Sequence, residues 1–127
     1  MFHLVIDLEM CKVPRDYRSK SYRYAYEIIQ IGAVLLDDSF KRIGTLCQYV
    51  HPEHGVIDYF IENLTGIKNS QVKKAPKLEE VLIHMIDWLG ERDYKIYAWQ
   101  APLCGIFYLR SVAVARYAAL IRINDYK

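Results

Sequence analysis

The feature that most constrains this chain is an apolar run near its start that carries two carboxylates. Residues 2 to 10 are mostly apolar and rich in branched side chains, yet Asp7 and Glu9 lie among them. Such a run predicts a central strand covered on both faces of a sheet. Side chains alternate along a strand, so the two carboxylates would share one face, with about 6.6 Å of strand between them. Burying two like charges is costly without a cation, so the pair indicates a metal site. On the pair alone, the alternative that Asp7 ends the strand and Glu9 lies in a solvated loop stays open.

Length and composition fit one globular domain that needs no membrane. The chain has 127 residues, of which 53% are hydrophobic, enough for a modest core. The longest apolar segment, residues 103–123, is interrupted by three arginines, and no basic flank precedes the first apolar run. We therefore expect neither a membrane span nor a signal peptide. Three cysteines without CxxC spacing favour reduced thiols and a cytoplasmic location.

A basic and aromatic segment follows the carboxylates. The net charge of the whole chain is only +2, so its overall balance does not require a nucleic-acid partner. Within residues 12–26, however, Asp16 is the one acid, among five basic residues and four tyrosines: Lys12, Arg15, Arg18, Lys20 and Arg23, and Tyr17, Tyr22, Tyr24 and Tyr26. Cations for phosphates and rings for bases are what a single-strand binding loop needs, and Arg15, Arg18 and Tyr22 are its candidate residues. The alternative is a solvated loop whose tyrosines pack back on the core.

The remaining pattern predicts an α/β fold with a mixed sheet in the order βββαβ. We expect strands over residues 27–36 and 43–50, joined by a turn at residues 37–39. Residues 57–72 predict short helical turns. A helix should follow, with Pro76 in its first turn and Gly90 at its end. A short strand is expected over residues 95–99. His51 and His54 flank Pro52 and Glu53, a pattern more typical of a solvated turn than of a metal site.

Several of these motifs, in this order, resemble the DEDD-type (DEDDh) 3′-to-5′ exonucleases. They are Asp7-x-Glu9, the strand Glu27 to Val34, Leu64-Thr-Gly-Ile67, Ala75-Pro76 and Tyr97-Ala-Trp99. Within that group, the chain is similar to the branch that contains ribonuclease T, the proofreading subunit of bacterial DNA polymerase III and small exoribonucleases that trim RNA 3′ ends. The resemblance covers residues 1–99.

The resemblance implies a ribonuclease H-like fold and a two-ion site for Mg²⁺ or Mn²⁺. Asp7 would bridge the two ions and Glu9 would hold one of them, so that a water is activated for attack on a phosphodiester. The same resemblance implies where a 3′-terminal nucleotide would lie. The backbone near Met10 and Cys11 and the turn Leu64, Thr65, Gly66 and Ile67 would hold it.

After Trp99 the family pattern is not continued. The family has an aspartate shortly after this strand and later a helix with a histidine and a last aspartate. Here no histidine follows His84, and Asp125 is the only acid after Asp93. Residues 100–127 also carry four basic side chains and one acidic one, whereas residues 1–99 carry 13 and 14. We therefore expect residues 1–99 to be the N-terminal part of an exonuclease domain, C-terminally truncated relative to the family. Residues 100–127 would be an atypical tail, helical in part, and either that tail or a second copy in a homodimer would cover the truncated edge.

Two functions therefore stay open from the sequence. The first is a metal-dependent 3′-to-5′ exonuclease that acts on single-stranded RNA or DNA. The second is a catalytically incomplete relative that binds nucleic acid without cleaving it. The first follows from the resemblance, and the second follows from the absent catalytic residues.

Overall fold

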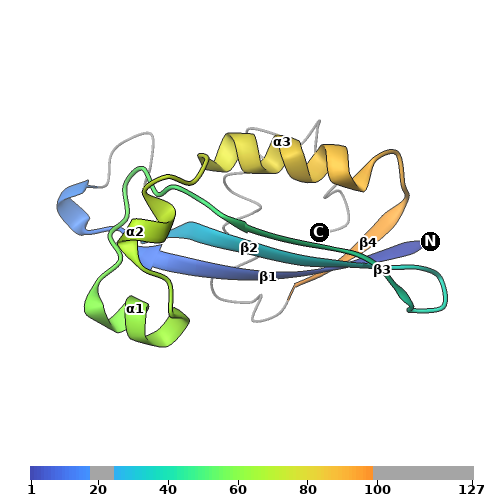
Figure 1. The fold of residues 1–127 in the computed structure, drawn as a ribbon, viewed down its shortest axis with the longest axis horizontal. Coiled ribbons are helices and arrows are strands. Elements are labelled where there is room, and N and C mark those ends of the chain that lie inside the picture. Colours follow the sequence, from blue (N-terminus) through green and yellow to red (C-terminus); the bar gives the residue numbers. More distant parts are fainter. Residues whose placement is uncertain (18–24, 99–127) are drawn as a thin grey trace.

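A computed structural model describes residues 1–17 and 25–98, in which four strands form one mixed sheet (Figure 1). The strands are β1 (Phe2–Lys12), β2 (Tyr26–Leu36), β3 (Arg42–Tyr49) and β4 (Tyr94–Ala98). Their order across the sheet is β3-β2-β1-β4. β1 pairs with β2 and β2 pairs with β3 in the antiparallel sense, whereas β1 and β4 are parallel. The predicted βββαβ order and mixed sheet are confirmed.

The helices are short except for the last one, which comes directly before β4 in the chain. They are η1 (Arg15–Tyr17), α1 (Tyr59–Thr65), α2 (Asn69–Val72) and α3 (Leu78–Leu89). The short turns predicted within residues 57–72 are thus α1 and α2. Gly90 ends α3 as predicted, with a φ of 62°. The position predicted for Pro76 was wrong, because Lys77 is the N-cap and the helix begins only at Leu78.

One face of the sheet packs against α3. Alternate residues of β1, among them Leu4 and Ile6, are buried in one core with Val81, Leu82, Met85 and Leu89 of α3. These four helical residues have the three- and four-residue spacing of a single helix face. Burial of each large side chain contributes about 1.5–3 kcal/mol, so this layer is the main source of stability.

The opposite face is covered by α1 and α2 at one end. A second buried cluster contains Cys11, Ile29, Ile57, Ile61, Ile67 and Val72. Figure 1 shows α3 and α1 on opposite sides of the sheet. Further along this face, Val5 is 37% exposed and Asp7 is also exposed. The prediction that β1 is covered on both faces over its whole length is therefore wrong for the described residues, since the helix layer here ends short of the two carboxylates.

A buried carboxylate that the sequence did not single out fixes the loop between β3 and α1. Glu27 of β2 is 7% exposed. Its two oxygens accept backbone hydrogen bonds from Glu53, His54 and Gly55, at 2.5, 2.8 and 2.5 Å. His51 is held in the same region, its Nδ1 lying 3.0 Å from the carbonyl oxygen of Val72. The segment from His51 to His54 is thus held by hydrogen bonds and is half-buried except at Glu53, whereas the sequence predicted a solvated turn.

None of the helices within residues 1–17 and 25–98 is long and apolar enough to cross a membrane. The tail predicted over residues 100–127 lies outside the described residues, and so do Arg18 and Tyr22. The domain boundary after residue 99 and the homodimer stay predictions.

Candidate functional site

Asp7 and Glu9 lie on the same face of β1, beyond the part covered by α1. Asp7 is paired with Gly32 of β2, and Glu9 is paired with Gln30. Because Gly32 has no side chain, this neighbour does not cover the Asp7 carboxylate. Directly after Glu9 the register shifts, so that Met10 faces Ile28 and Ile29 is an extra residue in β2. Such bulges often lie next to functional sites, where they redirect side chains.

The electrostatics of the pair favour a bound cation. Partial burial raises the pKa of Glu9, and the negative charge of Asp7 raises it further. A cation between the two carboxylates would reverse both effects, because it favours their ionised forms. An all-oxygen donor pair of this kind suits Mg²⁺ or Mn²⁺. Within residues 1–17 and 25–98, however, no three His, Cys, Asp or Glu side chains are grouped to hold a metal, so Asp7 and Glu9 fit as part of a ligand set.

The turn at the end of α1 combines one exposed apolar side chain with a rigid backbone. Leu64 is 69% exposed, whereas Ile67 is only 3% exposed and packs beside Cys11. Thr65 Oγ1 donates to the carbonyl oxygen of Ile61 at 2.8 Å and accepts from the amide of Ile67 at 3.1 Å. Gly66 has a φ of 75°, a left-handed conformation that glycine adopts without strain. Of the four residues predicted here, Leu64 thus presents its side chain to solvent and Ile67 serves the core.

The exposed side of α1 extends this apolar surface. Phe60 is four residues before Leu64, on the same side of the helix, and is 60% exposed. The ammonium group of Lys12 lies 5.3 Å from the centre of its ring. An aromatic ring with a cation beside it is a common platform for a nucleobase and its phosphate.

Met10 and Cys11 have different surroundings, although they are adjacent in the chain. Met10 packs against the α3 core, and Cys11 is fully buried against α1. Burial, followed by the charge of Glu27, raises the pKa of the Cys11 thiol to about 12. The thiol is therefore protonated at neutral pH and is not a nucleophile. Only the backbone of these two residues can serve the predicted nucleotide contact.

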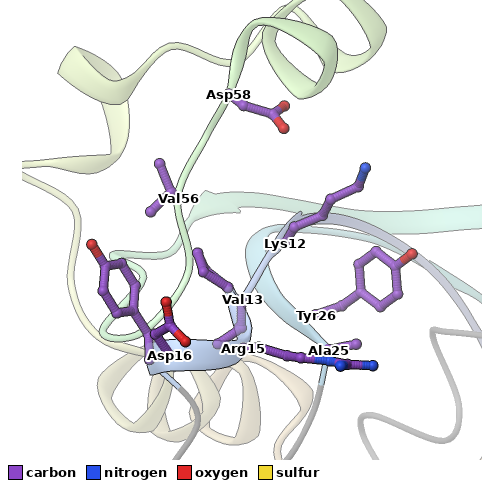
Figure 2. A pocket seen from close by; sticks show the side chains of 10 residues that line it. Lys12, Val13, Arg15, Asp16, Ala25, Tyr26, Val56 and Asp58 are labelled. Atoms are coloured by element: carbon purple, nitrogen blue, oxygen red, sulfur yellow. The ribbon is translucent and has the colours of Figure 1, made fainter.

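The basic segment after β1 borders a cavity with a volume of about 540 Å³ (Figure 2). Arg15, Asp16 and Tyr17 of η1 line it together with Lys12 and Tyr26. Val56 and Asp58, from the loop that Glu27 holds, line it as well. Arg15, which the sequence predicts to contact nucleic acid, thus lines this cavity. The sequence did not single out Val56 and Asp58, because only the fold brings the loop before α1 next to η1.

Comparison with known proteins identifies the family. The family model RNase_T, described as an exonuclease, matches residues 4–121. The chain belongs to this exonuclease family. Human ERI1 exoribonuclease 2 is 34% identical over 88 residues, which are 68% of this chain and 12% of the relative. Human 3′-5′ exoribonuclease 1 is 36% identical over 72 residues, which are 55% of this chain and 21% of the relative. The chain thus spans about a fifth or less of the length of these two curated relatives.

A solved structure supports the same branch. The nuclease domain of 3′hExo, a DEDDh family member bound to rAMP, superposes with a TM-score of 0.68 at 25% identity. The similarity covers 91% of this chain and 60% of that one. The ribonuclease H-like fold and the DEDDh resemblance are confirmed by these findings.

Proposed function

We propose that this chain is a metal-dependent exonuclease module that removes nucleotides from the 3′ end of single-stranded RNA. The observation that supports it most is the placement of the exposed Asp7 and the half-buried Glu9 on one face of β1, whose end at Cys11 and Lys12 packs against α1. RNA rather than DNA is proposed because the two curated relatives described above are named exoribonucleases. The three cysteines favour a reducing compartment, so the proposal includes a cytoplasmic location.

Asp7 and Glu9 would hold Mg²⁺ or Mn²⁺ in this proposal. When bound, such ions activate a water and stabilise the leaving oxygen of a phosphodiester. The role of the chain is to present both carboxylates from one rigid strand. The raised pKa of Glu9 means that this carboxyl takes up its proton at a higher pH than an ordinary glutamate, and a bound cation would oppose that uptake.

The turn after α1 would hold the terminal nucleotide. Leu64 offers an exposed apolar surface for the face of a base, and Phe60 with Lys12 lies one helical turn away. The hydrogen bonds of Thr65 and the left-handed Gly66 fix the backbone of this turn. A preformed turn reduces the entropy lost when the nucleotide binds.

A second function, binding without cleavage, is favoured by one observation. Asp7 and Glu9 are not joined by a third His, Cys, Asp or Glu in the described part of the chain, and no histidine follows His84 in the sequence. A histidine general base typically contributes about 10²- to 10⁴-fold to a rate. A chain without one would retain metal and nucleic acid while turning over slowly or not at all.

The experiment that separates the two functions uses a 5′-labelled single-stranded RNA and its DNA equivalent, each with Mn²⁺ or Mg²⁺. Wild type is compared with Asp7→Ala and with Asp87→Ala, which removes an exposed acid of α3 outside the site. A ladder that shortens from the 3′ end in wild type and Asp87→Ala, but not in Asp7→Ala, supports the exonuclease. Retention of the oligonucleotide on a filter with no shortening supports the binding module instead.

A further inference from the structure

The cavity at the end of β1 is lined by charges of both signs that have no ion-pair partner among the described residues. Arg15 and Asp16 of η1 form no salt bridge within residues 1–17 and 25–98. Lys12 contacts the ring of Phe60 and no described carboxylate. Asp58 uses Oδ1 to cap α1, accepting from the amide of Ile61 at 2.9 Å, and its Oδ2 accepts no hydrogen bond from a described residue. Cations and acceptors that share one cavity, and that are not paired with each other among residues 1–17 and 25–98, suit a ligand that carries both anionic groups and N–H donors.

We propose that this cavity is a subsite that recognises the base of an upstream nucleotide in a single-stranded RNA. This inference rests on the proposed nuclease or binding function, but it concerns a different place from the carboxylate pair. Lys12 is three residues beyond Glu9, about 10 Å along the strand. A nucleotide in the cavity is therefore not the 3′-terminal one but a neighbour further upstream.

Some lining residues suit the phosphate of a nucleotide, and others suit its base. Lys12 and Arg15 are suited to its phosphates. Tyr17 is 58% exposed, and its ring offers a stacking surface. A cavity of about 540 Å³ lies within the usual range for small-ligand sites, which is about 300–1,000 Å³. Asp16 and Asp58 line the cavity from separate segments, η1 and the loop before α1, and Figure 2 shows their carboxylates well apart.

The Asp16 carboxylate sets the base preference, because Oδ1 of Asp58 already accepts the amide of Ile61. Single-stranded RNA is read through the Watson–Crick edges of its bases, and a carboxylate can only accept hydrogen bonds. Guanine presents two adjacent N–H donors on this edge, which match one carboxylate. Uracil presents a single N–H between two carbonyl oxygens, and these repel a carboxylate. The cavity is therefore a guanine-preferring subsite.

The test uses fluorescein-labelled uridine heptamers in which one guanosine is moved step by step from the 3′ end. Binding is followed by fluorescence anisotropy in EDTA, so that no cleavage is needed. We expect one upstream position at which guanosine tightens binding about tenfold, within the range of a bidentate base contact. Equal affinity for all positions would overturn the subsite, whether or not the protein is a nuclease.

Charge-removing variants distinguish base recognition from general attraction to an anion. Loss of any acid should tighten binding of an anionic strand if only overall charge matters. The subsite predicts the opposite, namely that Asp16→Asn loses the tenfold preference for guanosine, whereas Asp58→Asn keeps most of it. Asn still caps a helix, so Asp58→Asn keeps α1 in place. Asp87→Asn on α3 is the matched control and should keep the preference. If Asp16→Asn and Asp87→Asn tighten binding equally, the inference is wrong.

The cation side is tested by the dependence of affinity on salt. Arg15→Gln should weaken binding of every heptamer by a similar factor and should reduce the slope of log K against log salt by about 0.7, the value for one single-strand phosphate contact. Arg42→Gln, on the distant end of β3, is the control and should leave the slope unchanged. An unchanged slope for Arg15→Gln would remove the arginine from the subsite. A positional guanine preference without any metal-dependent cleavage would keep the subsite and reject the nuclease.

Discussion

Replacement of Glu27 by glutamine should destabilise the protein markedly, although it changes only one oxygen of the carboxylate into an amide nitrogen. The carboxylate is buried and accepts three backbone hydrogen bonds, one at Oε1 and two at Oε2. Glutamine keeps one acceptor oxygen but turns an amide nitrogen toward at least one backbone N–H. At least one charge-assisted bond is lost and a buried donor has no acceptor, which together cost about 3 kcal/mol.

The cost should appear in equilibrium urea unfolding of Glu27→Gln followed by far-ultraviolet circular dichroism. The midpoint should fall while the slope with urea stays the same, because the surface exposed on unfolding is unchanged. Glu62→Gln is a suitable control, since Glu62 lies on α1 and its side chain makes no hydrogen bond within the described residues. A loss below about 0.5 kcal/mol in Glu27→Gln, equal to that of a surface substitution, would refute this account of the loop.

The Glu27 variant also links stability to function. The loop that it holds continues into Val56 and Asp58, which line the cavity beside η1. A loosened loop should therefore weaken the guanosine preference proposed for the cavity, whereas the Mn²⁺ affinity proposed for Asp7 and Glu9, on the strand next to β2, should stay unchanged. Metal affinity can be followed by the rise in melting temperature with Mn²⁺, which measures binding to the folded state.

Three further substitutions test other parts of the site. Gly66→Ala places a side chain at a φ of 75° and should destabilise by about 1 kcal/mol in urea unfolding, with Ser70→Ala as the surface control. Leu64→Ala removes a side chain that is 69% exposed, so the free energy of unfolding should hardly change. The affinity for a 3′-terminal nucleotide, measured by anisotropy, should fall severalfold. A fall in affinity that is accompanied by a similar loss of folding free energy would show a structural role for Leu64 instead. Glu9→Gln should stabilise the metal-free protein at neutral pH, because the pKa of Glu9 is raised above its ordinary value of 4.5 in the fold. The stability that this shift contributes to wild type is present below pH 4.5 and is lost as pH rises through the raised pKa. The stabilities of wild type and variant should therefore converge in acid. In Mn²⁺ the order should reverse, and a variant that still gains stability from Mn²⁺ as wild type does would exclude Glu9 as a ligand.

The sequence predicts the sheet well because its signals are local. The apolar run of β2, the turn acid Asp37 and the apolar face of α3 each specify their own element. Asp37, for instance, ends the strand by accepting the amides of Ser39 and Lys41 at 2.9 Å each. The pair Asp7 and Glu9 also lies within one strand, so their shared face follows from alternation alone.

The parts that the sequence did not predict depend on contacts between distant segments. The role of Glu27 arises because a loop 26 to 28 residues later turns its amides toward β2. The contribution of Asp58 to the cavity arises because the same loop passes η1. A glutamate at the start of an otherwise apolar strand was the available signal, since a buried carboxylate requires partners. Its partners are backbone amides, which have no signature in the sequence.

The direction of β1 explains why these features lie in a row. Its side chains change surroundings step by step, from the exposed Asp7 and the half-buried Glu9, through Cys11 buried under α1, to Lys12 at the rim of the cavity. The bulge after Glu9 allows this change, because the extra residue Ile29 joins the cluster of Cys11. A single strand therefore sets the spacing between the proposed metal ligands and the proposed upstream subsite. Insertion of two residues after Met10 would keep the alternation of faces but shift Lys12 along the strand by about 7 Å. If the subsite is real, the preferred position of guanosine in the heptamer should then move further from the 3′ end or disappear, whereas the Mn²⁺-dependent stabilisation through Asp7 should remain.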